Sequence, residues 1–442
     1  MMVVTQQTPR THNPTLAEQE AIPPRMPALL LPLPLPSTKA PFPYTPFTNP
    51  PPPSLLTHTL THPTPTPSPS QYLIKVQTAA LTRGELGWPE TLSPNHPSIP
   101  STGHPTSTSS SSDNNDDGGA GARDGDNNNE NYYVIPAHEI AGIVLSTPQT
   151  DEHMSTGPKF KVGDEVIGLL AFERDGGAAD VAVAEEGELA FKPRNVGAAE
   201  AAGVVMGGLT GWQGLVEYGG LVDGSKEVTR VLVLNASGGV GVMVCQLLRA
   251  EMLFGGGEDA KRRFWVCGVC SGKNAEFVRG ELGVDEVLNY RVEEEEKGGR
   301  RGNDDNRGES GWLAEAFRKR GWPPVDLVMD CIGGDTLRQA YDPAVVRDGG
   351  RVVSVAQPVP EKEKEWEGVR AEIERRRLIS RFFIVRPDGE QLAKISKLVE
   401  EGELKPVVER EMELYQGREA MELVESGRIR GKVVLRVSFY DR

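Results

Sequence analysis

Cysteine is scarce in this chain of 442 residues. It holds four, all in the second half: Cys245, Cys267, Cys270 and Cys331. That is too few for a secreted fold held together by disulfides, so a reducing compartment is expected, and the cytoplasm is the favoured one. A mitochondrial location is the alternative, although Arg10 and Arg25 are isolated and proline interrupts any amphipathic presequence helix.

Long apolar runs and basic stretches are lacking as well. The longest apolar runs are far shorter than a membrane span. Proline interrupts the leucines of 29–35 at every second or third position, which argues against a signal peptide. The formal net charge is −15 and no useful run of Lys and Arg occurs, whereas nucleic-acid binding requires a basic face. We therefore expect a soluble protein with neither nucleic-acid nor membrane partners.

Three segments are too rich in proline or in polar residues to be expected to form a packed core. Residues 1–70 are rich in Pro, Thr and Ser and are predicted to be a disordered tail, with an SH3- or WW-type ligand as the less favoured alternative. Residues 101–131 consist almost entirely of Ser, Asn, Asp and Gly and are predicted to be a disordered insertion. Residues 293–310 open with four glutamates and are predicted to be a flexible, solvated loop.

The ordered stretches between these segments change character once along the chain. After a strand at 72–80, residues 136–193 hold short β-rich runs separated by Gly and Asp turns, which is typical of a small rolled β domain. From 230 onward, strands alternate with helices, which predicts a parallel sheet covered on both faces. A helix at 389–401 and a last strand at 431–437 follow.

The strongest local signal is a glycine turn. Apolar residues 230–235 run into Ala236-Ser237-Gly238-Gly239-Val240-Gly241, and a helical pattern follows at once. A dinucleotide pyrophosphate must approach backbone N–H groups closely at a helix N-terminus, where larger side chains would intrude. A glycine pattern alone is weak, but a strand before it and a helix after it favour a dinucleotide site over a merely structural turn.

The end of the next strand indicates which dinucleotide binds. An NAD site usually has an acidic residue there, which binds the ribose 2′-hydroxyl. This chain has Ser271 and Lys273 instead, and these groups would attract the 2′-phosphate of NADP. We therefore predict NADPH as the cofactor, while a role for Lys273 in merely solvating a helix start is the alternative.

Cys267 and Cys270 form a CxxC pair, which is also found in metal and redox sites. Both lie on an apolar strand, and no second pair of Cys or His follows them. Packing in the core is therefore favoured over metal binding.

Several stretches together resemble the medium-chain dehydrogenase/reductase superfamily, in its zinc-independent, quinone-oxidoreductase-like branch. The matching stretches are 135–144 (IPAHEIAGIV), 160–168 (FKVGDEVIG), 199–203 (AEAAG), 208–213 (GLTGWQ), the glycine turn, 325–334 (VDLVMDCIGG), 349–353 (GGRVV) and 427–435 (GRIRGKVVL). The resemblance implies an α/β protein with a GroES-like, β-rich catalytic domain and a doubly wound (Rossmann) nucleotide-binding domain. The expected boundaries are 71–200 for the catalytic domain, 201–360 for the NADP-binding domain, and 361–442 for the return to the catalytic domain. The family's first β hairpin, which normally precedes the strand at Tyr72, is not recognisable in the proline-rich segment.

The resemblance also implies roles for single residues. Pyrophosphate contacts are implied for Ser237, Gly238, Gly239, Val240 and Gly241. Ser271 and Lys273 would bind the 2′-phosphate, Tyr290 would lie beside the adenosine phosphate, and Thr210 would lie near the nicotinamide.

The substrate side of the site departs from the family pattern. Relatives often have Asn and Asp where this chain has Thr82 and Glu85. Thr82, Glu85 and Trp88 are therefore weak catalytic candidates: Thr82 as a hydrogen-bond donor and Trp88 as a pocket wall, with turn or core roles as the alternatives. Among the zinc-ligand positions of zinc-dependent relatives, only His138 keeps a ligand. Thr82 stands at the first position and the third falls near Met206, so no metal is predicted.

The implied reaction is hydride transfer from NADPH to a small-molecule quinone or α,β-unsaturated carbonyl without a metal. The alternative is a catalytically idle NADP-binding scaffold or accessory protein, which the insertion at 101–131 would suit. Because dimers are common in the resembled family, a homodimer is possible.

Overall fold

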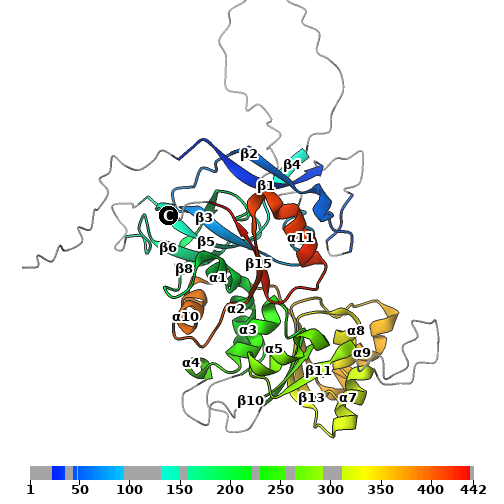
Figure 1. The fold of residues 1–442 in the computed structure, drawn as a ribbon. Coiled ribbons are helices and arrows are strands. Elements are labelled where there is room, and N and C mark those ends of the chain that lie inside the picture. Colours follow the sequence, from blue (N-terminus) through cyan, green and yellow to red (C-terminus); the bar gives the residue numbers. More distant parts are fainter. Residues whose placement is uncertain are drawn as a thin grey trace, which may run out of the picture.

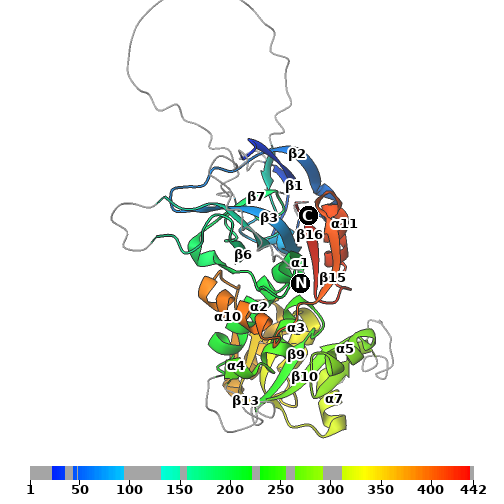
Figure 2. The same cartoon turned by 60° about the vertical axis from the view of Figure 1, so that its left-hand side comes forward.

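The computed structural model describes residues 22–34, 43–46, 48–93, 131–149, 157–221, 229–254, 264–291 and 311–438. The predicted insertion at 101–131 lies outside these residues except for its last position, and the predicted loop at 293–310 lies outside them entirely. Figure 1 shows a β-rich lobe above an α/β lobe, and Figure 2 shows the same two lobes after a rotation. They correspond to the expected catalytic and nucleotide-binding domains and are named the catalytic lobe and the nucleotide lobe below.

The catalytic lobe is built on a seven-stranded sheet with the order β15-β16-β3-β5-β6-β8, in which β7 also pairs with β3. Its strands are β3 (Tyr72–Leu81), β5 (Glu139–Ser146), β6 (Glu165–Leu169), β7 (Val181–Ala184), β8 (Leu189–Phe191), β15 (Val408–Glu413) and β16 (Lys432–Arg436). β16 comes from the end of the chain, yet it pairs antiparallel with β3 near the start. Both ends of the chain therefore complete one lobe, as the resemblance predicts.

The N-terminal segment contains ordered strands, so the expectation of a disordered tail over 1–70 is wrong for these residues. β1 (Arg25–Pro34) pairs antiparallel with β2 (Thr57–Pro63), and its second half pairs with β4 (Asn131–Val134). The buried leucines of β1 include Leu29, Leu31 and Leu33. Pro27 lies where the register between β1 and β2 shifts, a position that tolerates a residue without an N–H group. Burial of the leucines therefore outweighs the proline content.

The nucleotide lobe is a six-stranded parallel sheet with the order β11-β10-β9-β12-β13-β14. Its strands are β9 (Thr229–Leu234), β10 (Phe264–Cys270), β11 (Glu286–Asn289), β12 (Val325–Asp330), β13 (Val346–Ser354) and β14 (Ile379–Phe382). The chain order reverses between β9 and β12, and ligands of doubly wound sheets bind in the crevice at such a point. The predicted doubly wound fold is confirmed.

The predicted return to the catalytic domain at 361 comes too early. Helix α9 (Glu367–Arg376) still packs with the nucleotide lobe, and β14 pairs with β13 as the last strand of its sheet. β14 is short and polar, with the sequence Ile-Ser-Arg-Phe, so it lacks the apolar pattern of a central strand.

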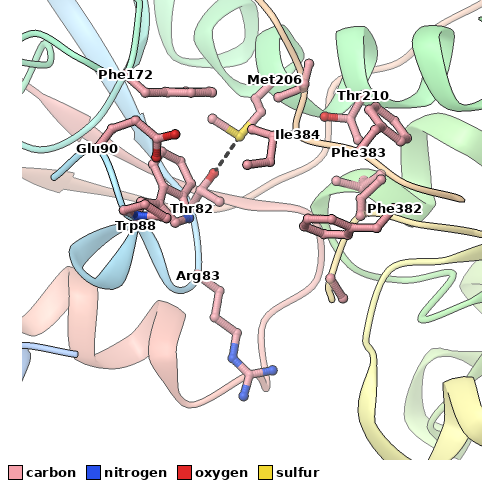
Figure 3. A pocket seen from close by; sticks show the side chains of 15 residues that line it. Thr82, Arg83, Trp88, Glu90, Phe172, Met206, Thr210, Phe382, Phe383 and Ile384 are labelled. Atoms are coloured by element: carbon pink, nitrogen blue, oxygen red, sulfur yellow. Dashed lines mark hydrogen bonds between the residues drawn. The ribbon is translucent and has the colours of Figure 1, made fainter. Parts of the chain in front are cut away.

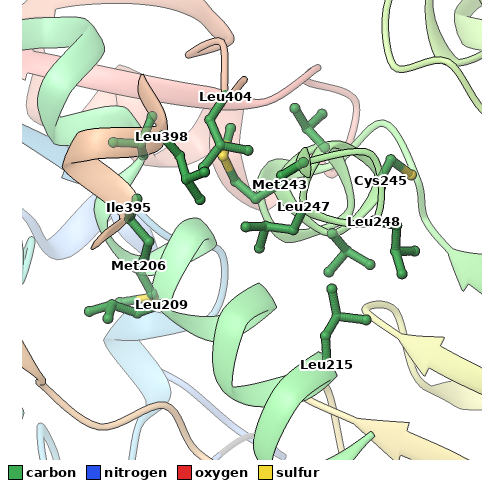
Figure 4. Packing of buried hydrophobic residues seen from close by; sticks show 14 of the residues in the cluster. Met206, Leu209, Leu215, Met243, Cys245, Leu247, Leu248, Ile395, Leu398 and Leu404 are labelled. Carbon is green, nitrogen blue, oxygen red and sulfur yellow. The ribbon is translucent and has the colours of Figure 1, made fainter. Parts of the chain in front are cut away.

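Helices cover both faces of the parallel sheet. Among the described residues, the helices are α1 (Ala198–Gly203), α2 (Val205–Trp212), the π-helix η4 (Gln213–Tyr218), α3 (Gly239–Leu247), α4 (Glu251–Phe254), α5 (Ala275–Gly280), α7 (Trp312–Arg320), α8 (Gly334–Ala340), α9, α10 (Gly389–Glu400) and α11 (Gly417–Glu425). Short 3-10 turns are η1 (Pro53–Leu55), η2 (Glu85–Gly87), η3 (Glu186–Glu188), η6 (Gly272–Asn274), η7 (Lys364–Trp366) and η8 (Leu414–Gln416). Figure 4 shows Leu209 of α2 near Ile395 of α10, and Leu247 of α3 on the other side of the same core. This packing joins the two lobes through one apolar cluster.

Two further findings bear on the sequence predictions. Within the described residues, every helix falls short of the length and apolar character that spanning a bilayer requires. Cys267 and Cys270 are unpaired and buried, so their predicted role in core packing is confirmed. Burial raises the pKa of both thiols, to about 11 for Cys270, which keeps them protonated and unreactive.

Candidate functional site

The glycine turn lies at the carboxyl end of β9, at the point where the strand order reverses. Helix α3 begins within it, at Gly239, and no described side chain caps the first turn of this helix. A Cβ on Gly241 would overlap the backbone of Asn235, and a Cβ on Gly207 of α2 would come within 2.6 Å of the Gly239 carbonyl oxygen. Bare backbone at these positions lets the turn and the two helices approach closely. The uncapped amides at the start of α3 can bind an anion.

The turn after β10 lies beside the glycine turn. Ser271 and Asn274 are buried there, and the side-chain amide of Asn274 donates a 2.9 Å hydrogen bond to the Ser237 hydroxyl. Lys273 is exposed, and its ammonium donates a 2.9 Å hydrogen bond to the backbone oxygen of Arg428. Half-buried Tyr290 follows the end of β11, the next strand of the sheet. The structure thus gathers the predicted adenosine-side residues at one edge of the parallel sheet.

A pocket opens between the two lobes, where Val240 of α3 and Thr210 of α2 meet the catalytic lobe (Figure 3). Trp88 and Phe172 line its catalytic side, with ring centroids 4.8 Å apart in an edge-to-face arrangement. Residues 382–385, which follow β14, line the opposite side. Most of this lining is apolar, so the pocket suits a flat, weakly polar molecule.

A buried ion pair lies behind the pocket wall. The Lys432 ammonium donates hydrogen bonds to the Glu139 carboxylate at 2.5 Å and to the Thr82 hydroxyl at 2.7 Å. Thr82 in turn donates to Glu139 at 2.8 Å and contacts the sulfur of Met206 at 3.4 Å. The backbone N–H of Met206 donates to the other oxygen of Glu139 at 3.0 Å. Of these four residues, Thr82 and Met206 line the pocket.

Glu85 lies behind the same wall and does not line the pocket. It is buried, and neither of its carboxylate oxygens has a hydrogen-bond partner among the described residues. Burial raises the pKa of Glu85 well above its ordinary value, while the nearby Lys432 ammonium acts in the opposite direction. Glu85 therefore favours the neutral acid. Unlike the other two weak catalytic candidates, Thr82 and Trp88, it does not reach the pocket, because the turn of η2 directs it into the core.

The loop after β12 is held in place by a buried acid. Asp330 accepts hydrogen bonds from the Ser354 hydroxyl at 2.6 Å and from the amide of Gly333 at 3.0 Å. The Ser354 hydroxyl also accepts a hydrogen bond from the amide of Ala356, which lines the pocket. Burial raises the pKa of Asp330. This contact joins the carboxyl ends of β12 and β13 and fixes the loops on this side of the crevice.

The side chains at the family's zinc-ligand positions do not suit zinc. A Thr hydroxyl and a Met thioether stand where thiolates or carboxylates are needed. His138 uses Nε2 in a 3.1 Å contact with the backbone oxygen of Arg174. The described residues hold no group of three or more His, Cys, Asp or Glu side chains that could bind a metal. An ammonium that contacts Thr82 and Glu139 would also repel a divalent cation.

Sequence reasoning missed Lys432, Glu139 and the pocket segment 382–385. Two signals were available. Glu139, directly after His138, is the first residue of the largely apolar strand β5, and Lys432 is the first residue of the largely apolar strand β16. A charged residue at either place needs a buried partner.

Comparison with known proteins finds relatives that match most of this chain. A sequence model of the family described as zinc-binding dehydrogenase matches residues 282–435. A protein of Arthroderma benhamiae named "Probable zinc-binding oxidoreductase, mitochondrial" is 35% identical over 307 residues, which cover 69% of this chain and 80% of that protein. The chloroplast envelope quinone oxidoreductase homolog of Arabidopsis thaliana is 29% identical over 68% of this chain and 79% of its own length.

A solved structure has the same fold. The quinone oxidoreductase from Coxiella burnetii superposes with a TM-score of 0.61 at 22% identity, covering 94% of this chain and all (100%) of its own.

Proposed function

Because this chain belongs to the medium-chain dehydrogenase/reductase superfamily, in its quinone-oxidoreductase-like branch, we propose that it uses NADPH to reduce a quinone or an α,β-unsaturated carbonyl without a metal. That it is an oxidoreductase with a nicotinamide cofactor follows from the family. The choice of NADPH, the substrate class and the independence from zinc are the proposal.

The observation that carries the choice of NADPH is the pair Ser271 and Lys273 at the end of β10, beside the glycine turn. A hydroxyl and an ammonium at this place attract a 2′-phosphate, whereas the usual carboxylate would repel it. Ser237 belongs to the same group of turns, since Asn274 links it to the turn of Lys273. Tyr290 follows β11, which pairs with β10 in the sheet. We assign the 2′-phosphate to Ser271 and Lys273, and the adenosine phosphate to the surroundings of Tyr290.

The glycine turn would hold the pyrophosphate. The amides of Gly239 to Gly241, in the first turn of α3, supply the donors, whereas the amide of Gly238 already bonds the carbonyl oxygen of Asn235. Thr210 lies at the pocket end of the crevice, where the nicotinamide would sit. When bound, the reduced nicotinamide supplies a hydride.

The chain's own residues prepare the substrate. Trp88 and Phe172 exclude water from the catalytic side of the pocket. The Thr82 hydroxyl, one of several polar groups in the lining, is placed to meet a carbonyl or quinone oxygen. The proton that completes the reduction comes from solvent. The four free cysteines suit a reducing compartment, and we propose the cytoplasm or the mitochondrion.

The test compares cofactors and a charge-reversed variant. We expect the purified protein to bind NADPH more tightly than NADH and to oxidise NADPH with a panel of quinones and enones. Lys273→Glu should weaken NADPH binding on the order of 10- to 100-fold, because a charge-assisted contact becomes a repulsion. Lys397→Glu reverses the same charge at an exposed place on α10 and should leave binding unchanged.

Two results would count against the proposal. If the Lys273→Glu variant still preferred NADPH over NADH to the same degree, the assignment of the 2′-phosphate to Lys273 would be wrong. Tight NADPH binding without turnover of any quinone or enone would instead favour the catalytically idle scaffold.

A further inference from the structure

Lys432 is an unusual residue for its place in the fold. It opens β16 and is 6% exposed, and its partner Glu139 is 0% exposed. Its stem lies against the glycine turn, because a Cβ on Gly239 would come within 2.8 Å of the Lys432 Cδ. The ammonium group thus lies between the cofactor turn and the pocket wall. Burying such a pair costs desolvation free energy. Apolar residues of similar size could fill the same space without this cost.

The contacts of Lys432 overlap the positions of a catalytic zinc site. By family resemblance, Thr82 and Met206 stand where zinc-dependent relatives have ligands, and Thr82 is bonded to Lys432. The family description and the Arthroderma benhamiae relative are both named for zinc, yet in this chain the side chain at the first ligand position, Thr82, accepts a hydrogen bond from a protein cation. This difference between zinc in the names of the relatives and an ammonium in this chain indicates a role for Lys432 in the site.

We propose that the Lys432 ammonium is the fixed positive charge of this active site in place of zinc, and that it acts on the substrate oxygen through the Thr82 hydroxyl. This inference rests on the proposed reductase function. Lys432 is a positioning residue, because Thr82 lines the pocket and Lys432 does not.

The hydrogen-bond geometry allows this role without breaking the ion pair. The Thr82 hydroxyl accepts from Lys432, so its own hydrogen stays available to turn from Glu139 to a substrate oxygen. Glu139 then keeps two other donors, the Lys432 ammonium and the amide of Met206. A hydroxyl that accepts from a cation is a stronger donor than a free hydroxyl.

The charge appears during reduction of the substrate. As the β-carbon of an enone gains a hydride, the alkene electron pair shifts toward the carbonyl and leaves a negative charge on its oxygen. Thr82 meets this charge, and the nearby ammonium lowers its energy. A proton from water at the α-carbon then restores the neutral carbonyl product.

The experiment is a double-mutant cycle on the full chain. Glu139→Gln with Lys432→Met removes both charges together and leaves no unpaired ion in the core. Thr82→Val removes the hydroxyl. We expect each change to lower kcat on the order of 10- to 100-fold, in line with loss of an oxyanion donor. The combination of all three should lower kcat no further than either change alone, because Lys432 acts through Thr82.

Controls separate this role from folding. Lys75→Met with Asp180→Asn removes a second ion pair of the same lobe, with a 2.8 Å contact, and should leave kcat unchanged. Lys432→Arg keeps the charge and should retain most of the activity lost in Lys432→Met. The dissociation constant of NADPH is measured for every variant, and the zinc content of the wild-type protein is expected to be far below one per chain.

The outcomes are distinct. Losses of kcat that simply multiply in the combined variant would show separate, structural roles and overturn the inference, as would one zinc per wild-type chain. In the first case the proposed function still stands, whereas one zinc per chain would also remove its independence from zinc and leave the cofactor and substrate class standing. A wild-type protein that binds NADPH but reduces nothing overturns the proposed function, and the inference with it.

Discussion

The side-chain amide of Asn274 donates a hydrogen bond to the Ser237 hydroxyl at 2.9 Å, and both residues are buried. This bond joins the turn after β10 to the glycine turn after β9, so the two phosphate-binding regions share one support. Replacing Asn274 with Ala should weaken NADPH and NADH binding alike, by about 1–2 kcal/mol or roughly 5- to 30-fold in dissociation constant. Fluorescence titration with each nucleotide measures this loss. Asn195→Ala removes a comparable 2.9 Å bond to Val399 far from the turn and serves as the control. A loss confined to NADPH would contradict the shared support.

The strand β1 makes a prediction about stability. Leu31 is 0% exposed, whereas Leu60 on the neighbouring strand β2 is 67% exposed. Leu31→Ala should lower the free energy of unfolding by about 2–5 kcal/mol, because a buried cavity replaces the side chain. Leu60→Ala should change it by less than about 0.5 kcal/mol. Urea denaturation of both variants measures the difference, and equal values would show that β1 contributes little to the core.

Glu85 predicts a particular dependence of stability on pH. Its pKa is raised in the folded state, so the folded protein keeps a proton that the unfolded chain releases above about pH 4.5. The stability tied to that proton is complete below pH 4.5 and falls as the pH rises toward the raised pKa. Glu85→Gln removes this loss, so the melting temperature of the variant should gain on that of the wild type as the pH rises. Thermal melts from acidic to mildly alkaline pH test this, and a constant difference would show that folding does not raise the pKa of Glu85.

The pocket walls predict a change in substrate affinity. Trp88 lies edge to face with Phe172, and both line the pocket. Trp88→Leu should raise the KM for a quinone on the order of tenfold, while the KM for NADPH changes little. Trp265→Leu removes a tryptophan from the far end of β10, where it packs on Trp322, and should leave both constants unchanged. A matching rise in the KM for NADPH would place Trp88 at the cofactor instead.

Local patterns predicted the parts of the fold that local sequence determines. The strand at Phe264–Cys270 is a continuous apolar run, and the strand at Val325–Asp330 is apolar except for Asp326 and Asp330. The glycine turn combines a strand, bare backbone and a helix within a few positions. β1 was missed because its prolines hide a buried alternation, and β15 was missed because its glutamates and arginine resemble a solvated segment.

The core of the candidate site depends on contacts that sequence patterns do not report. Lys432 and Glu139 are separated by 293 residues, and only the closure of the catalytic lobe by the last strand brings them together. Thr82 was recognised as a candidate from its position in the family pattern. Its bond to Lys432 could not be recognised, since no periodicity or motif connects the two residues.

The backbone of the last strand reaches the nucleotide turn itself: the N–H of Gly431 donates to the carbonyl oxygen of Ser237 at 3.0 Å, and Gly431 forms a bridge with Gly238. A motion that opened the crevice by swinging the lobes apart would have to rotate about this point or rupture it. An opening on the side of residues 382–385, across the pocket, would instead leave the Ser237–Gly431 contact intact.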